Sequence, residues 1–219
     1  MSILLFLGPP GSGKSTQASL ISEYLHIPFI SMGKLVRLSL DGKYKAYKKS
    51  VNEGNLLPDH IVFDILSDTI NQFDTNIGFV LEGYPRTIAQ AERLDELLGK
   101  KDMCISMVLL LMLHDHDVIL NRLTKRIQCS HCGKIVDARI EKNHSTCPVC
   151  HTPLMTRVDD NPDAISQRIL LYQQEIQSLV DFYREKSIVQ EINADRSVEE
   201  VKDQILQLIH SRLNQEIHS

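Results

Sequence analysis

The chain lacks several features that would assign it to a broad class of protein. It has no tryptophan, and aromatic residues make up only 5% of its 219 positions. No apolar run approaches the roughly 20 residues that cross a membrane, and the apolar stretch 3–7 is too short for a signal peptide and lacks its basic leader. The net charge is −4, whereas a general nucleic-acid binder uses a basic surface. We therefore expect no membrane partner and no nucleic-acid partner.

Cysteine is also scarce, and four of the five cysteines form two C-x-x-C pairs. These are Cys129 with Cys132 and Cys147 with Cys150. We expect a cytoplasmic protein, in which thiols stay reduced, so this spacing indicates a metal site rather than disulfides. Four thiolates are typical of a closed structural zinc site, with unliganded thiols or a redox pair as the alternatives. The fifth cysteine, Cys104, is expected to be a small buried residue.

The N-terminal region contains a complete phosphate-binding loop. Residues 8–15, GPPGSGKS, match the pattern G-x-x-x-x-G-K-[ST] and lie between the apolar run 3–7 and a helical pattern at 14–25. Backbone N–H groups of such a loop converge on phosphate oxygens, helped by the following helix N-terminus. We expect Lys14 to bridge the outer phosphates and Ser15 to offer its hydroxyl to Mg²⁺. The alternative is an ordinary glycine turn at the end of a strand.

Short apolar runs alternate with helical patterns along the rest of the chain. They lie at 27–30, 78–81, 105–113 and 187–192. The alternation predicts an α/β fold with a parallel sheet of about five strands and helices on both faces. The longest helix should begin near Asn161, which can cap it. Two segments break the rhythm, because 31–61 is polar and helical in pattern and 127–156 has neither a helical nor a strand period.

Charged side chains follow several of these elements. Glu82 ends the run 78–81, where a carboxylate can hold Mg²⁺ through water, with an ordinary solvated acid as the alternative. Phosphoryl transfer needs charge neutralisation, and guanidinium groups pair with phosphate oxygens in bidentate geometry. A single arginine is more often a surface charge. The candidates are Arg37, Arg86, Arg122, Arg126, Arg157 and Arg168.

Arginines flank the cysteine-rich segment on both sides. We expect Arg122 and Arg126 to share one face of a helix that runs to Arg126. Arg157 and Arg168 flank the start of the long helix, so the segment between these pairs can swing as a lid. The stretch HDHD at 114–117 looks like a metal cluster, but helix capping explains it better.

In these motifs the chain resembles adenylate kinases, specifically the long type with a zinc-bearing lid. The likeness covers nearly the whole chain and rests on the cysteine quartet and on segments 8–17, 30–37, 54–59, 78–90, 121–126 and 156–168. It implies a P-loop kinase fold with a five-stranded parallel sheet flanked by helices, and a monomeric enzyme that transfers a phosphoryl group reversibly from ATP to AMP with Mg²⁺. It divides the chain into a core (1–30, 61–126 and 158–219), a helical insertion that binds the nucleoside monophosphate (NMP; 31–60) and a zinc lid (127–157).

The resemblance also implies roles for individual residues. The ATP contacts would be Gly11, Ser12, Gly13, Lys14, Ser15, Thr16, Arg122, Ile135, Val136 and Arg196. The AMP contacts would be Met32, Arg37, Asn55, Leu56, Leu57, Gly83, Tyr84, Pro85, Arg86, Gln90, Arg157 and Arg168. The catalytic groups would be Lys14, Arg86, Arg126, Arg157 and Arg168. Asp159 or Asp160 would orient arginines at the lid hinge, and Ser15 and Glu82 would hold Mg²⁺. Closure of both flaps would exclude water from the reaction.

Three residues near the predicted acceptor pocket and Mg²⁺ site depart from the family pattern. Met32 and Lys34 replace Thr and Asp, so a hydrogen bond to the purine is lost and a charge is reversed. Glu82 replaces Asp and is one methylene longer. These changes leave another acceptor, such as CMP or UMP, as the alternative, although the Gln90 amide favours adenine because it can pair with both N1 and N6.

Two other classes of function fit the residues less well. A nucleotide-dependent switch would have no use for a second nucleotide pocket, which Arg37, Arg86 and Gln90 indicate. A zinc-ribbon nucleic-acid binder fits the cysteines but not the acidic balance of the chain.

Overall fold

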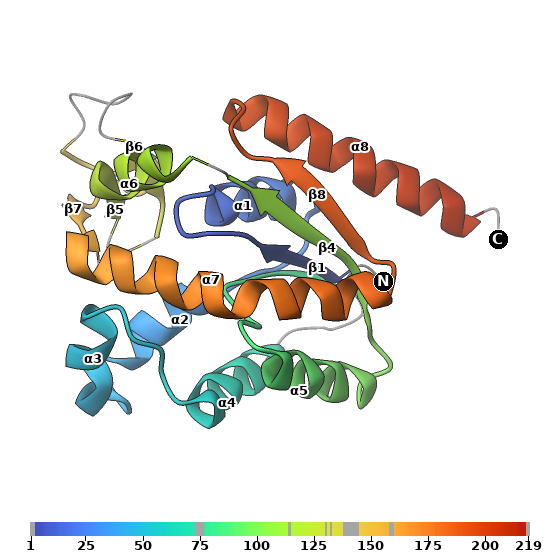
Figure 1. The fold of residues 1–219 in the computed structure, drawn as a ribbon, viewed down its shortest axis with the longest axis horizontal. Coiled ribbons are helices and arrows are strands. Elements are labelled where there is room, and N and C mark those ends of the chain that lie inside the picture. The colour runs from blue at the N-terminus through green and yellow to red at the C-terminus, as the bar shows by residue number, and fades with distance from the viewer. Residues whose placement is uncertain are drawn as a thin grey trace.

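The computed structural model describes residues 3–72, 77–113, 115–129, 131, 133–137, 145–157 and 160–217. Within these residues, a five-stranded parallel sheet forms the centre of the molecule (Figure 1). Its strands, in spatial order, are β2 (Phe29–Ser31), β3 (Phe79–Glu82), β1 (Ile3–Leu7), β4 (Ile105–Met112) and β8 (Val189–Asn193). Every residue of the central strand β1 is buried, as expected for a parallel strand covered on both faces. The predicted five-stranded parallel sheet is confirmed.

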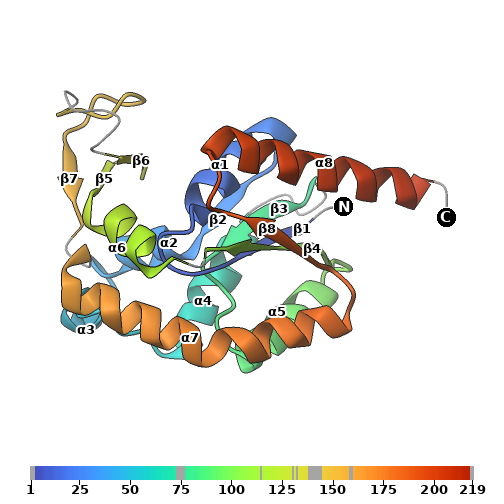
Figure 2. The ribbon, with the colours of Figure 1, turned by 45° about the horizontal axis from the view of Figure 1, so that its top comes forward.

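Helices cover both faces of this sheet (Figure 2). Alternate side chains of β1 point to opposite faces, so Leu5 packs in one hydrophobic cluster and Phe6 in another. The Leu5 cluster includes buried residues of α4 (Asp59–Ile70), α5 (Ile88–Gly99) and α7 (Pro162–Glu185). The Phe6 cluster includes buried residues of α1 (Lys14–Leu25), α6 (His116–Thr124) and α8 (Val198–Ile217). The phosphate loop therefore leaves the middle of a sheet that is fixed from both sides.

Two helix starts form as the sequence predicts. The Asn161 side chain accepts a hydrogen bond of 3.0 Å from the Ala164 N–H at the start of α7. The Asp115 carboxylate accepts hydrogen bonds from the N–H groups of Asp117 (2.8 Å) and Val118 (3.3 Å) at the start of α6. The capping role expected within 114–117 is confirmed for Asp115, whereas His114 lies outside the described residues.

The polar segment after β2 is helical, as its pattern predicts. It contains α2 (Met32–Ser39), a 3₁₀ turn (Lys45–Tyr47) and α3 (Lys48–Asn52). Leu40, Leu57 and Ile61 form a small hydrophobic cluster between this segment and α4. Val62 and Ile65 pack against both this cluster and the Leu5 cluster, so the segment is continuous with the main core.

The cysteine-rich segment contains strands that the sequence analysis missed. β5 (Arg126–Cys129), β6 (Ile135–Asp137) and β7 (Leu154–Thr156) form an antiparallel sheet with β5 in the middle. The segment 127–156, which shows no strand period in the sequence, nonetheless forms these strands. Strands of three or four residues are too short to show a period, and their hydrogen bonds are made to partners distant in sequence.

Two predictions are wrong. Helix α6 ends at Thr124, so Arg126 begins β5 and does not share a helical face with Arg122. Cys104 is exposed rather than buried. It precedes β4 between the buried residues Met103 and Ile105, and the alternation of an extended backbone turns its side chain outward. Among the described helices, none combines the length and the apolar composition that a membrane span requires.

The helical segment of residues 31–60 contacts the core closely at Gly54. Gly54 has φ +91°, and a Cβ atom at this position would lie 2.7 Å from the Ala164 carbonyl oxygen at the start of α7. This backbone conformation and this approach both require glycine.

We expect Gly54→Ala to lower the free energy of unfolding by about 1–3 kcal/mol, because it adds backbone strain and a clash. Urea denaturation followed by circular dichroism measures this. Gly42→Ala is the matched control, since the nearest atom to its Cβ would be the Ser39 carbonyl oxygen at 4.0 Å. Equal effects of the two substitutions would contradict a specific role for the contact between Gly54 and α7.

Candidate active site

The phosphate loop joins β1 to α1 and encloses a lysine. Gly8, Gly11 and Gly13 all have positive φ. At Gly8 a Cβ atom would lie 2.5 Å from the Leu111 carbonyl oxygen, so only glycine fits against β4. Lys14 opens α1, and its ammonium group donates to the carbonyl oxygens of Gly8 (2.7 Å) and Pro9 (2.8 Å). The predicted strand, glycine loop and helix are all present.

The Lys14 ammonium group lies in an environment that disfavours its charge. Burial lowers its pKa from 10.5 to about 8, and the nearby guanidinium groups of Arg86, Arg168 and Arg126 add to this effect. The Glu82 carboxylate opposes it. A negatively charged group bound in the loop would stabilise the ammonium form and reverse the shift.

Glu82 is a buried carboxylate at the carboxyl end of β3. It is 9% exposed, and its Oε2 accepts a 3.0 Å hydrogen bond from the Ser31 hydroxyl at the end of β2. The alternative of an ordinary solvated acid is therefore wrong. Glu82 connects the phosphate loop side of the sheet with the residue that immediately precedes α2.

Three arginines converge on Asp160 at the other side of the loop. The Asp160 carboxylate is completely buried and accepts from Arg126 Nε at 2.8 Å and from Arg126 Nη2 at 2.5 Å. Arg168 Nη1 donates to it at 3.1 Å, and Arg157 Nε lies 4.0 Å from it. The sequence analysis left Asp159 and Asp160 as alternatives, and the structure shows Asp160 in this position; Asp159 lies outside the described residues.

A second polar cluster surrounds Gln90, in the first turn of α5. Its Oε1 accepts from the Arg86 N–H at 2.8 Å, and its Nε2 donates to Asp59 Oδ1 at 2.7 Å. The Tyr84 hydroxyl donates to the Gln90 carbonyl oxygen at 3.0 Å. A primary amide can accept and donate two hydrogen bonds each, so among the described residues one acceptor and one donor position of the Gln90 side chain remain unused. Asp59 was missed by the sequence analysis because its partner is 31 positions away.

The remaining residues of the predicted acceptor pocket lie close to this cluster in sequence or on α2. Met32 is buried and packs behind the turn at Gly83, where a Cβ atom on the glycine would lie 3.5 Å from Met32 Cβ. The Arg37 guanidinium lies over the first turn of α2, 3.3 Å from the position that a Cβ atom of Gly33 would occupy. The turn residue Pro85 and the loop residue Leu57 are buried, whereas Asn55 and Leu56 are exposed.

The residues predicted to contact the ATP base lie on three separate elements. Arg122, in the last turn of α6, donates to the Ala194 carbonyl oxygen at 3.1 Å and so contacts the connection between β8 and α8. Arg196 is exposed on that same connection. Ile135 and Val136 lie on β6 of the small sheet. Loop residue Ser12 is buried, and its hydroxyl has no hydrogen-bond partner among the described residues.

Three of the four paired cysteines come together. The sulfur atoms of Cys129, Cys147 and Cys150 all lie within 4.8 Å of one another, and the first and last are 3.4 Å apart. The Val149 N–H points to the Cys147 sulfur at 3.4 Å. Converging cysteine sulfur atoms of this kind fit a structural metal ion. Cys132 lies outside the described residues.

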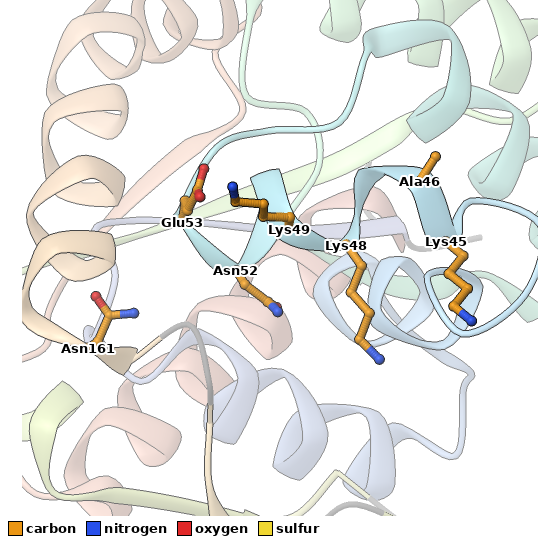
Figure 3. A pocket seen from close by; sticks show the side chains of 7 residues that line it. All are labelled: Lys45, Ala46, Lys48, Lys49, Asn52, Glu53 and Asn161. Carbon is orange, nitrogen blue, oxygen red and sulfur yellow. The ribbon is translucent and has the colours of Figure 1, made fainter.

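One hollow has no phosphate-loop residue in its lining (Figure 3). It is open, has a volume of about 610 Å³, and lies between α3 and the start of α7. Its lining residues are Lys45, Ala46, Lys48, Lys49, Asn52, Glu53 and Asn161. None of the residues predicted to bind a nucleotide lines this hollow.

Comparison with known proteins gives consistent matches. The family model described as adenylate kinase matches residues 6–188. The chain is 36% identical to an adenylate kinase of Clostridium botulinum over 203 residues, which cover 90% of the chain and 94% of that protein. It is 35% identical over 207 residues to an adenylate kinase of Archaeoglobus fulgidus, covering 92% and 95% of the two chains. It is likewise 35% identical over 208 residues to an adenylate kinase of Finegoldia magna, covering 93% and 96%.

The cluster around Asp160 leads to a prediction about stability. Asp160→Asn would remove the buried carboxylate charge that the partly buried guanidinium groups of three arginines face. We expect the free energy of unfolding to fall by about 2–3 kcal/mol, the low end for a broken buried pair because the arginines keep some exposure.

Thermal and urea unfolding measure this loss. The control is Asp181→Asn, which removes an Asp–Arg pair that is about half exposed on α7 and should change stability by less than about 1 kcal/mol. If the Asp160 cluster had no structural importance, Asp160→Asn and Asp181→Asn would lower the free energy of unfolding by similar amounts.

Proposed function

This chain belongs to the adenylate kinase family, and we propose how its residues divide the work of transferring the terminal phosphoryl group of ATP to AMP to give two ADP. The observation that carries the proposal is the convergence of Lys14, Arg126 and Arg168 beside the phosphate loop. Phosphoryl transfer depends mainly on positioning and on neutralisation of charge. A cluster of this composition supplies both.

The ATP phosphates would lie along the backbone of Gly11–Thr16, with Lys14 contacting the outer phosphates. The ATP base would lie between Arg122 and the connection carrying Arg196, and Ile135 and Val136 of the small sheet would cover it. The hydrogen bond from Arg122 to the Ala194 carbonyl oxygen supports this arrangement, because it joins two of these elements. The segment 127–157 would act as the lid over this nucleotide.

AMP would bind on the side of Gln90 and α2. Its phosphate would pair with Arg37 and Arg86, and the Gln90 amide would use its remaining acceptor and donor positions on the adenine N6 and N1 atoms. The backbone of Asn55–Leu57 and the turn Gly83–Pro85 would contact the nucleoside. Met32 shapes this pocket from behind, which explains how the chain tolerates a residue that cannot hydrogen-bond a purine.

The transferring group would lie between the two nucleotides. Arg157 and Arg168 would leave their shared carboxylate partner, Asp160, or extend from it, to contact the phosphoryl oxygens together with Arg86 and Arg126. Because Asp160 holds two of these guanidinium groups by direct hydrogen bonds, their directions are set before substrate arrives. Closure of the NMP insertion and the lid would exclude water, so that the phosphoryl group reaches AMP.

Two metals complete the proposal. Mg²⁺ would accompany ATP, held by the Ser15 hydroxyl and, through water, by Glu82, whose position at the strand end supports this role. It neutralises phosphate charge when bound. Zinc would be held by Cys129, Cys132, Cys147 and Cys150 and would stabilise the lid, which is too small for a hydrophobic core of its own. We further propose a monomer that acts in the cytoplasm.

A panel of nucleoside monophosphates with ATP and Mg²⁺ tests the acceptor. We expect AMP to give the highest kcat/KM in a coupled assay, because the two unused hydrogen-bonding positions of Gln90 match adenine. Gln90→Leu is the informative variant, since it should raise the KM for AMP while leaving the KM for ATP unchanged. Turnover with CMP or UMP but not with AMP would contradict the proposed acceptor.

Lys14 provides a prediction about pH. Burial holds its pKa near 8, and the triphosphate of ATP favours the ammonium form. ATP binding should therefore take up about half a proton at pH 8 and less at pH 7, and affinity should decrease as pH rises above 8. Calorimetric titrations in buffers of different ionisation enthalpy measure the uptake.

The control for this titration is Lys14→Arg. A guanidinium group stays charged throughout this range, so proton uptake should disappear in the variant while its remaining affinity becomes independent of pH. Equal uptake by the two proteins would show that another group titrates.

A further inference from the structure

Lys34 reaches from the NMP insertion to the cysteine-rich lid. It is the third residue of α2 and is only partly exposed. A Cβ atom placed on Gly133 would lie 3.4 Å from Lys34 Cδ and 3.7 Å from its Cε. The aliphatic stem of Lys34 therefore lies directly against the backbone of Gly133, which is 99 positions later in the chain.

Gly133 belongs to a tightly bonded turn between β5 and β6. Its N–H donates to the Cys129 carbonyl oxygen at 3.1 Å, and its carbonyl oxygen accepts from Gln128 Nε2 at 2.9 Å. The Cys129 N–H in turn donates to the Lys134 carbonyl oxygen at 2.9 Å. Gly133 has φ +78°, a conformation that favours glycine. Lys34 thus packs on a rigid part of the lid, directly beside the residue that carries one of the clustered sulfur atoms.

The two cationic side chains of α2, Lys34 and Arg37, extend to different places. The Arg37 guanidinium lies over Gly33, within α2 itself, whereas the Lys34 stem extends to Gly133. The family pattern has an aspartate at position 34. The lysine that replaces it therefore lies between the two flaps rather than in the acceptor pocket. Cysteines bind metals as thiolates, so a metal-loaded quartet would carry net negative charge, which a lysine complements and an acidic residue would oppose.

We propose that Lys34 is a positioning residue that couples the NMP insertion to the lid, so that closure over one nucleotide favours closure over the other. The inference rests on the proposed function, because it requires separate pockets for ATP and AMP. The contact joins the two flaps in their closed arrangement, so it favours the doubly occupied state over states in which nucleotide release opens either flap. By thermodynamic linkage, each nucleotide then raises the affinity for the other by the same factor.

The test measures this factor directly. The Kd of AMP is determined by calorimetry in the absence and in the presence of a saturating non-hydrolysable ATP analogue, and the ratio of the two values gives the coupling. We expect Lys34→Ala to lower the ratio by about threefold, as for the loss of one partly exposed contact between domains. The Kd of AMP alone should change little.

Two variants make the result specific. Lys45→Ala is the matched control, because Lys45 is an exposed lysine of the same insertion that lines the hollow beside α3 rather than the lid turn; its ratio should equal that of the wild type. Lys34→Met keeps an unbranched stem and removes the charge. If Lys34→Met restores the wild-type ratio, the packed stem carries the coupling. If the ratio stays low, the ammonium group carries it. Either result supports the contact.

Two outcomes would overturn the inference. An unchanged ratio in Lys34→Ala would show that the contact carries no coupling. A weaker Kd for AMP by the same factor with and without the ATP analogue would place Lys34 in the acceptor pocket alone. Failure of the wild-type chain to bind AMP at all would instead overturn the proposed function, so the two failures are distinguishable.

Discussion

The candidate site depends on crowding positive side chains into a small space before any negatively charged ligand is present. Lys14, Arg126 and Arg168 repel one another, and burial adds to the cost because it removes water from the charged groups. Two buried carboxylates offset this repulsion. Asp160 binds the guanidinium groups directly, and the charge of Glu82 favours the ammonium form of Lys14. Without these carboxylates the crowded positive charges would be strongly destabilised.

The fold explains why these groups meet. The phosphate loop and Glu82 both follow the carboxyl ends of neighbouring parallel strands, β1 and β3, which lie at the same edge of the sheet. Asp160 lies two residues before α7, and Arg126 begins strand β5 of the small sheet, so their ion pair joins the start of α7 to the small sheet. A hydrogen bond joins Glu82 to Ser31, the residue before α2. The small sheet and the helical segment after β2 are therefore each attached to the candidate site through a buried acid.

Much of this arrangement could be predicted from the sequence, because its signals are local. A continuous apolar run before GPPGSGKS identifies β1, the loop and α1 together, and Asn161 with Pro162 identifies the start of α7. The strands of the small sheet could not be predicted, since three or four residues show no period and their hydrogen-bond partners lie on other segments. The same applies to the bond between Gln90 and Asp59 and to the contact of Lys34 with Gly133. The helical assignment of Arg126 was wrong because spacing alone cannot show where a helix ends.

Lys14 also shows at which step a side chain loses its conformational entropy. An ammonium group has three N–H donors, and two of them are already held by the Gly8 and Pro9 carbonyl oxygens. The direction of the third is thereby restricted. Immobilising a free lysine costs up to about 2 kcal/mol in lost rotamers, and here that loss occurs when the chain folds. In the proposed site, a phosphate bound by Lys14 would therefore require little further ordering of the side chain, which favours its binding.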